Sequence, residues 1–452
     1  MEKEKRGNFG SKLGVVLAVA GSSVGLGNVW RFPTEVGSNG GAAFILVYLL
    51  CVALVGLPVM VSEFLIGRHT QANTITAFRR LAPGRWWRIG GVEGVFVAFL
   101  ILSYYIIVSG WTLFYTVSSL AGQLTDGTDY GAYFTNFMGH AWWSVASFLA
   151  FMVMVHVVVV RGVQDGIEKF SKLMMPILLL IIGVLVVSSF SMSGFTEGLE
   201  FLLKPDFSRV TPRVVLSALG QAFFSLSLAM GCLCTYASYF GPNTNLTKTA
   251  FSVAGIDTVV AVLSGFIVFP AAFSVGVQPD AGPGLVFVTL PSVFEMAFQR
   301  VPFVGYLFGS LFYVLLLLAA LTSAISLHES VTAYLHEEWR LSRRVAAALV
   351  SVGCSVLGIL CSLSMGGWGW LSVGGMNLFD LFDFLSAKII MPLGGIVIAL
   401  FAGWYLDRRL LHDEVTNRGT LRIPLFGLYV FLVRWVAPLG IAAVFIHQLL
   451  SA

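Results

Sequence analysis

Eleven apolar stretches, each long enough to cross a lipid bilayer as a helix, constrain this 452-residue chain more than any other feature. A helix needs about 20 apolar residues to span the hydrocarbon core. Only 11% of the residues are charged, against about 25% in soluble domains. We therefore predict an all-α integral membrane protein, which excludes most soluble enzymes and nucleic-acid binders. The predicted spans are residues 11–37, 42–68, 89–121, 141–160, 166–190, 212–240, 248–276, 303–337, 342–363, 375–404 and 425–450.

The Lys and Arg residues divide unevenly between the two sides that these spans define. Twenty of the 27 lie on the side of the N-terminus, and four lie on the other side, namely Lys204, Arg209, Arg213 and Arg300. Loops in the cytoplasm carry an excess of Lys and Arg. We therefore expect a multi-pass protein of the cell membrane with a cytoplasmic N-terminus and an extracellular C-terminus. The net charge of +4 is then loop charge and indicates no acidic partner.

The cysteines and histidines do not indicate catalysis. The five cysteines lie in apolar runs, and the CxC at 232–234 lacks the second ligand pair of a zinc site. The seven histidines do not cluster, and no HExxH or GxSxG motif is present. We expect neither an enzyme nor an organic cofactor.

Two spans contain glycine and hydroxyl residues where a membrane helix is normally regular. The first contains GSSVGLGN at 21–28, and the sixth contains FSLSLAMG at 224–231. Glycine weakens a helix, and backbone freed in the membrane must line a cavity or be buried in protein. Close packing of helices through small residues is the alternative. Because the two segments are five spans apart, they occupy matching places in two inverted halves, which predicts a central binding site for a carboxylate beside a cation.

At these residues the chain resembles the neurotransmitter:sodium symporter family. GSSVGLGNVWRFP (21–33) resembles its first helix, SYYIIVSGW (103–111) its third, RGVQDGIEKF (161–170) its fifth, GQAFFSLSLAMG (220–231) its sixth and AALTSAISL (319–327) its eighth. The resemblance implies a LeuT-type fold with a five-plus-five inverted repeat and Na⁺-coupled uptake of amino acids or related amines. It divides the chain into a cytoplasmic segment (1–10), a first repeat (11–190), an extracellular loop (191–211), a second repeat (212–404), a cytoplasmic loop (405–424) and an eleventh helix with the C-terminus (425–452).

The resemblance also implies two sodium sites built from oxygen atoms, which suit a hard cation. The first would use the Ser23 carbonyl, Asn28, Ser225 and Asp257, together with the substrate carboxylate. The second would use the carbonyls of Gly21, Val24 and Ala319 and the hydroxyls of Thr322 and Ser323. Hydroxyls that bond only to their own helix are the alternative for the last two residues.

The substrate pocket implied by the same motifs is apolar at one end. Its predicted lining is Ser22, Ser23, Leu26, Gly27, Ile101, Tyr105, Phe224, Ser225, Ser227, Met230, Ser323 and Leu327. Tyr105 would meet the substrate carboxylate, and Phe224 would close over it. A charged substrate side chain would lose its hydration at the apolar end, so we expect a hydrophobic or aromatic amino acid. Met230 favours a broad range of substrates because methionine repacks readily.

Two positions depart from parts of the family. Relatives that transport monoamines carry Asp where this chain has Gly25, which favours an α-amino acid as substrate. Chloride-dependent relatives carry Asn and then Ser where this chain has Asp257 and Ala261. A carboxylate within a span indicates function, and we expect Asp257 to replace chloride and to take up a proton when sodium leaves.

Further charged residues resemble the gates of the family. Arg31 and Asp383, with Gln221 nearby, resemble the extracellular pair, and Arg6 and Glu337 resemble the cytoplasmic pair. Lys388 also lies within a span, and the sequence assigns it no role.

Two alternatives to a symporter with a broad range of substrates remain open at this point. One is a symporter of narrow specificity, for Tyr or Trp or for small aliphatic residues. The other is a receptor or channel on the same scaffold that does not concentrate its substrate. The expected partners are the amino acid, sodium ions and the bilayer. The oligomeric state is left open.

Overall fold

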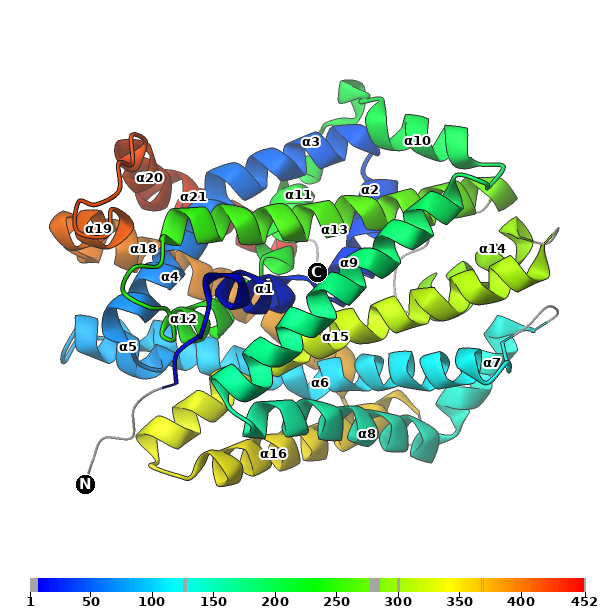
Figure 1. Ribbon diagram of the computed structural model, residues 1–452, viewed down its shortest axis with the longest axis horizontal. Helices are drawn as coiled ribbons and strands as arrows, with labels where there is room; N and C mark the ends of the chain where they lie inside the picture. Colours follow the sequence, from blue (N-terminus) through cyan, green and yellow to red (C-terminus); the bar gives the residue numbers. More distant parts are fainter. Residues whose placement is uncertain are drawn as a thin grey trace.

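The computed structural model describes residues 7–124, 128–276, 285–298, 301–366, 368 and 370–450, and these residues form a bundle of helices (Figure 1). Among them, nine helical segments are long and apolar enough to cross a membrane. A tenth span is formed by two helical pieces, Lys12–Ser23 and Gly27–Ser38, which meet at an angle of 56°. These ten agree with ten of the eleven predicted stretches. The remaining stretch, 212–240, consists of two shorter helices on either side of a non-helical segment at 226–231.

The elements of the first half are α1 (Lys12–Ser23), η1 (Gly27–Arg31), α2 (Phe32–Ser38), α3 (Ala42–Cys51), η2 (Val52–Gly56), α4 (Leu57–Thr70), α5 (Thr74–Leu81), α6 (Arg88–Leu120), α7 (Tyr130–Gly139), α8 (Ala141–Val160), η3 (Val163–Glu168), α9 (Lys169–Ser189), α10 (Phe195–Leu203) and η4 (Phe207–Arg209). Here η4 is a 3₁₀ helix and the other η segments are short π-helical turns inside longer helices.

The elements of the second half are α11 (Pro212–Ser225), α12 (Cys232–Ala237), α13 (Leu246–Val275), η5 (Leu285–Thr289), α14 (Leu290–Ala297), α15 (Pro302–Glu338), α16 (Arg343–Met365), β1 (Ser372–Val373), β2 (Met376–Asn377), α17 (Leu378–Asp383), η6 (Phe384–Ile390), α18 (Met391–Leu400), η7 (Phe401–Tyr405), α19 (Arg408–Val415), α20 (Phe426–Phe431), η8 (Leu432–Val436) and α21 (Ala437–Leu450). The strands β1 and β2 pair antiparallel, with Ser372 opposite Asn377.

The broken first helix lies inside the bundle. α1 packs against α9, α13 and α15, and α15 runs along α6 (Figure 1). From Gly14 to Ser23 every residue of α1 except Val16 is buried. A helix that is apolar on all sides is one that protein surrounds. The backbone freed where this helix breaks is therefore shielded from lipid, which is the condition for irregular structure at this depth.

The apolar stretch at 281–298 is not among the eleven predicted spans. Within its described part, Val286–Ala297 is an apolar helix of fewer than 18 residues. This length is too short for a span. Residues 281–284 lie outside the described part of the chain.

Candidate functional site

The predicted interruption of the first helix is present at residues 24–26. α1 ends at Ser23, and η1 begins at Gly27. The carbonyl oxygens released there accept hydrogen bonds from side chains of other helices. The Ser22 oxygen accepts from the hydroxyl of Ser227 at 3.0 Å. These contacts satisfy part of the freed backbone and hold the first break against the second.

The second interruption, at 226–231, contains three residues with left-handed backbone conformations. The φ angles are +53° at Ser227, +60° at Ala229 and +68° at Gly231. Residues other than glycine rarely adopt this conformation, and each one costs about 1–3 kcal/mol. Such strain persists where the surrounding structure enforces it and is common at binding sites. Ala229 therefore adopts a left-handed conformation that glycine would adopt without this cost.

A cavity of about 420 Å³ lies between the two breaks. All twelve residues predicted for the substrate pocket line it. It extends away from the breaks past Arg31 and Glu35 to Asp380 and Gln448. The cavity thus joins the centre of the bundle to one end of it, which we call the open end.

Gly25 determines what fits next to the first break. A Cβ at this position would lie 2.6 Å from the Ser323 hydroxyl and 3.3 Å from the Tyr105 hydroxyl. An acidic side chain would therefore displace Ser323. The Tyr105 hydroxyl accepts a hydrogen bond from the Leu26 amide at 3.4 Å. This end of the cavity consequently offers hydroxyls and backbone groups, without a carboxylate at position 25.

The residues predicted for the first sodium site meet at one point in the protein interior. Asn28 Nδ2 donates to Asp257 Oδ1 at 2.7 Å, and the Ser225 hydroxyl donates to Asp257 Oδ2 at 2.8 Å. Asp257 is fully buried, and among the described residues it makes no ion pair. Ser23 lies within the lining of the same cavity. These oxygen ligands, which include one carboxylate without a compensating positive charge, fit a small hard cation.

The residues predicted for the second sodium site meet where α1 ends against α15. The Thr322 hydroxyl donates to the carbonyls of Val24 (3.3 Å) and Ala319 (3.0 Å), and the Ser323 hydroxyl donates to Val24 at 3.1 Å. A Cβ at Gly21 would lie 3.2 Å from Thr322 Cβ. Thr322 and Ser323 therefore bond to the end of the first helix, and their hydrogen bonds are not confined to their own helix, α15. The carbonyls of Val24 and Ala319 and these two hydroxyls, with Gly21 beside them, fit a second cation of the same kind.

The two predicted partners of the outer gate both line the cavity, but each contacts another residue. Arg31 Nε lies 4.0 Å from Glu35 Oε1, and its guanidinium lies 4.4 Å from the centre of the Phe224 ring. Asp383 Oδ1 accepts a hydrogen bond from the Tyr104 hydroxyl at 3.1 Å. Gln221 is buried, and its side-chain amide has no hydrogen-bond partner among the described residues.

The other end of the bundle, which we call the N-terminal end, is closed by packed side chains. The Phe9 ring packs against Tyr236, Tyr239 and Phe240, and the Phe9 amide donates to the Tyr239 carbonyl at 3.2 Å. Glu337 Oε2 accepts hydrogen bonds from the amide and side chain of Asn73, both at 2.9 Å. Its predicted partner Arg6 lies outside the described residues.

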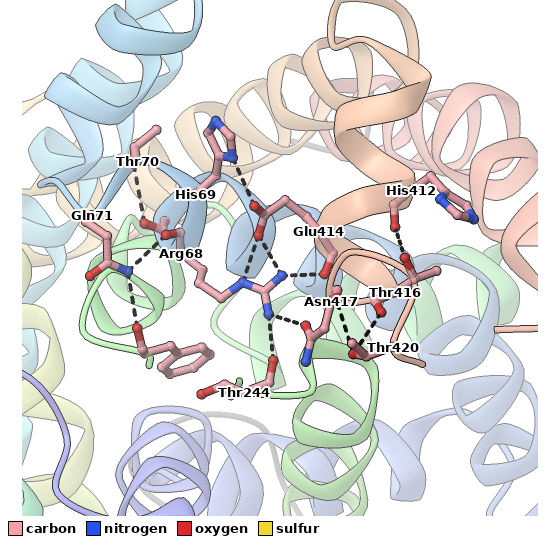
Figure 2. Close-up of polar contacts among 12 residues, drawn as sticks. Arg68, His69, Thr70, Gln71, Thr244, His412, Glu414, Thr416, Asn417 and Thr420 are labelled. Carbon is pink, nitrogen blue, oxygen red and sulfur yellow. Dashed lines mark hydrogen bonds and ion pairs between the residues drawn. The ribbon is translucent and has the colours of Figure 1, made fainter. Parts of the chain in front are cut away.

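Arg68 ties three segments together at the N-terminal end (Figure 2). It donates to Glu414 Oε2 from Nε at 2.8 Å, to the Thr244 carbonyl at 2.6 Å and to Asn417 Oδ1 at 2.7 Å. Its side chain is only 5% exposed. The end of α4, the loop before α13 and helix α19 are thereby fixed to one another.

Glu414 is held as a carboxylate in this cluster. Burial by itself would raise the pKa of Glu414, but the hydrogen bond with His69 and the charge of Arg68 outweigh it and hold the pKa below its usual value. The sequence contains no motif for this cluster, because His69 and Glu414 lie 345 positions apart in the chain and only the fold joins them.

Several residues of the cavity were not predicted from the sequence. Trp30, Val108, Ser326 and Gln448 line it, and so does Lys388, whose ammonium lies 5.3 Å from the centre of the Phe384 ring. For Lys388 the signal was available, because a cation within a span indicates a functional position. The apolar and aromatic residues carried no such signal.

Comparisons with known proteins identify the family to which the chain belongs. The model of the sodium:neurotransmitter symporter family matches residues 6–136 and 134–452. The chain is 39% identical to the uncharacterised sodium-dependent transporter YhdH of Bacillus subtilis (strain 168), over 99% of this chain and 98% of that protein. It is 27% identical to the human sodium- and chloride-dependent GABA transporter 2, over 91% of this chain and 75% of that protein.

A solved structure is also similar. The crystal structure of MhsT in complex with L-phenylalanine matches with a TM-score of 0.89 and 41% identity, covering 98% of this chain and all of that one. The chain belongs to the sodium:neurotransmitter symporter family. It is a sodium-dependent membrane transporter and not an enzyme.

Proposed function

We propose that this protein is a Na⁺-coupled symporter of hydrophobic and aromatic L-amino acids that works by alternating access and does not require chloride. The observation that carries the proposal is the cavity between the two breaks. Its lining combines the hydroxyls and backbone of the breaks with the apolar side chains of Ile101, Met230 and Leu327. An α-amino acid with an apolar side chain matches such a lining.

The lack of space for a larger side chain at Gly25 supports an α-amino acid, and not an amine without a carboxylate, as the substrate. An amine without a carboxylate needs a negative partner, and Ser323 occupies the space that an acidic side chain at position 25 would require. A substrate that brings its own carboxylate can complete the first sodium site beside Asn28 and Ser225. That MhsT was crystallised with L-phenylalanine supports the same class of substrate.

Asp257 supports independence from chloride. Sodium would be held by Asn28, Ser225 and Asp257, with the Ser23 carbonyl, and it would supply positive charge to the bound carboxylate. Asp257 already provides the fixed negative charge that balances it, buried and bonded to two of the same groups. A chloride ion at this place would add a second negative charge to the same buried site.

The cavity reaches one end of the bundle, while Phe9 and Arg68 close the other. The structure is therefore of the kind that alternating access requires, with a path on one side of a central site. We assign the open end to the outside of the cell, in agreement with the excess of Lys and Arg on the N-terminal side.

Uptake into proteoliposomes tests this proposal. With an inward sodium gradient, labelled Phe, Leu, Tyr and Trp should accumulate above equilibrium, and Lys and Glu should not. A channel or receptor would not concentrate them. Accumulation that does not depend on sodium, or a preference for a charged amino acid, would contradict the mechanism or the substrate class respectively.

Exchange of chloride for gluconate tests the role of Asp257. The wild-type rate should stay the same, and Asp257→Asn should transport only when chloride is present, because the anion would restore the missing charge. Ser264→Ala is the control. It removes a buried hydroxyl on the same helix whose one hydrogen bond within the described part of the chain is to the Val260 carbonyl. Loss of wild-type uptake in gluconate would exclude chloride independence.

A further inference from the structure

Glu93, on α6, is a half-buried acid whose carboxyl group points inward, and the sites described above assign it no role. Both of its carboxylate oxygens are buried and have no hydrogen-bond partner among the described residues. An ionised carboxylate in an apolar interior is strongly unfavourable unless it is paired, and it otherwise takes up a proton. Glu93 therefore requires a ligand of positive charge or a proton of its own.

The packing leaves space for this carboxyl group. A Cβ at Gly394 of α18 would lie 2.1 Å from Glu93 Oε2, so every other residue at position 394 would collide with it. Gly94, the residue after Glu93, lies close to the second break, because a Cβ added at position 94 would lie 3.1 Å from the Gly231 Cα. The carboxyl group is therefore enclosed beside segment 226–231.

A second acid with a free oxygen lies nearby. Glu63 of α4 is 1% exposed. Its Oε1 accepts a hydrogen bond from the Ala229 amide at 2.8 Å, and its Oε2 has no hydrogen-bond partner among the described residues. The two carboxyl groups are close enough to interact electrostatically. Glu63 thus connects Glu93 to the break itself.

No cation among the described side chains compensates this pair. Neither acid makes an ion pair in the described part of the chain. The other titratable group that acts on the pair is the Cys232 thiol of α12, and α18 contains no charged or titratable residue. Two carboxylates in such surroundings repel each other, so they cannot both be ionised.

The chemistry of the surroundings favours a proton over a metal ion. A metal ion needs several oxygen ligands, and the described residues contain no group of three or more acids, cysteines and histidines that could hold one. We propose that Glu63 and Glu93 form a proton-binding site, with the proton on Glu93 and the negative charge on Glu63. The Ala229 amide stabilises the ionised form of Glu63, and Glu93 receives no such hydrogen bond from the described residues.

This site is coupled to the break because one hydrogen bond belongs to both. When segment 226–231 rearranges in the transport cycle, the bond from Ala229 to Glu63 changes, and the tendency of the pair to hold its proton changes with it. The proton is then released and taken up again once per cycle. This exchange is separate from the proton that Asp257, on α13, is expected to take up when sodium leaves.

Infrared difference spectroscopy of the purified protein in lipid tests the proposal directly. A C=O band of a protonated carboxyl should be present, and its amplitude should change when Na⁺ replaces choline. Glu93→Gln should abolish the band. Glu329→Gln, the control for a buried acid that is paired with Arg343, should retain it. Because the trigger is sodium alone, failure of the proposed substrate class would leave this test intact.

Glu63→Gln provides a second variant. It leaves the proton on Glu93 but removes the neighbouring charge, so the band should remain and shift in frequency. Glutamine has the shape of a protonated glutamate, and the thermal midpoint in detergent checks that each variant is folded. A band that Glu93→Gln leaves unchanged, or that does not respond to sodium, would overturn the proposal.

Discussion

The two ends of the bundle use their arginines in different ways. At the N-terminal end, Arg68 is 5% exposed and bonds to Glu414, Thr244 and Asn417. At the open end, Arg31 is 35% exposed, and its nearest acidic contact, Glu35, is 4.0 Å away. One guanidinium is saturated with short hydrogen bonds, and the other rests on an aromatic ring.

This difference indicates which end is shut in the structure. An end of the bundle that is held by a buried arginine with a full set of partners opens only if all of those hydrogen bonds break together. The predicted partner of Arg31, Asp383, is instead held by a single bond from Tyr104, which one side-chain movement can replace. The open end can therefore close at small cost, whereas the N-terminal end must lose a network before it opens.

Arg68→Ala should produce the largest effect. Removal of one member of a buried ion pair costs about 3–5 kcal/mol, because it leaves the other charge uncompensated. We expect a lower thermal midpoint in detergent and faster labelling of the native Cys234, which is 2% exposed. Arg79→Ala, whose pair with Glu338 has a 52% exposed arginine, should cost about 0–1 kcal/mol. Equal losses in the two variants would contradict the comparison.

Tyr104→Phe should act at the opposite end and by a smaller amount. It removes a hydrogen bond to a charged group, worth about 1.5–3 kcal/mol, and releases Asp383 for Arg31. The open end should then close more readily, which slows the dissociation of bound L-phenylalanine. Tyr130→Phe, on helix α7, is the control. Faster dissociation in Tyr104→Phe would show that Tyr104 does not hold the gate residues apart.

Ala229→Gly tests the segment between the two ends. A left-handed alanine costs about 1–2 kcal/mol, and glycine regains part of this while adding about 0.5–1 kcal/mol of entropy loss on folding. We expect a change in unfolding free energy of no more than about 1 kcal/mol, measured by thermal denaturation. A loss of several kcal/mol would show that the methyl group of Ala229 has a packing role that its backbone angle does not reveal.

Mild acid should weaken the contact between Arg68 and Glu414, and by the smallest amount. The pKa of Glu414 is lower in the folded protein than its ordinary value of 4.5. Its stabilising effect is therefore complete above pH 4.5 and is lost as the pH falls through the lower, folded value. The thermal midpoint of the wild type should fall more steeply below pH 4.5 than that of Glu414→Gln. Parallel curves would exclude Glu414 as the responsible group.

The two breaks could be predicted from the sequence because glycine and hydroxyl residues within an apolar run weaken a helix at that point. The cavity lining could also be predicted, since the motifs around Ser22 and Phe224 resemble those of a family whose architecture is shared. The contact of Asp383 with Tyr104 could not, because the two residues lie on separate helices, 279 positions apart in the chain. The role of Glu93 was equally hidden, since Glu63 comes near it only through the packing of α4 against its neighbours.

What the sequence determined by itself is the class of the protein and the composition of its central site. Long apolar runs must become buried or lipid-facing helices, and the charges left within them must have partners, so their positions mark function. Only the tertiary structure decided which partners those charges have. Arg68 with Glu414, and Glu63 with Glu93, are pairs from separate helices, and electrostatic contacts of this kind depend on distances of a few ångströms that the order of residues along the chain does not encode.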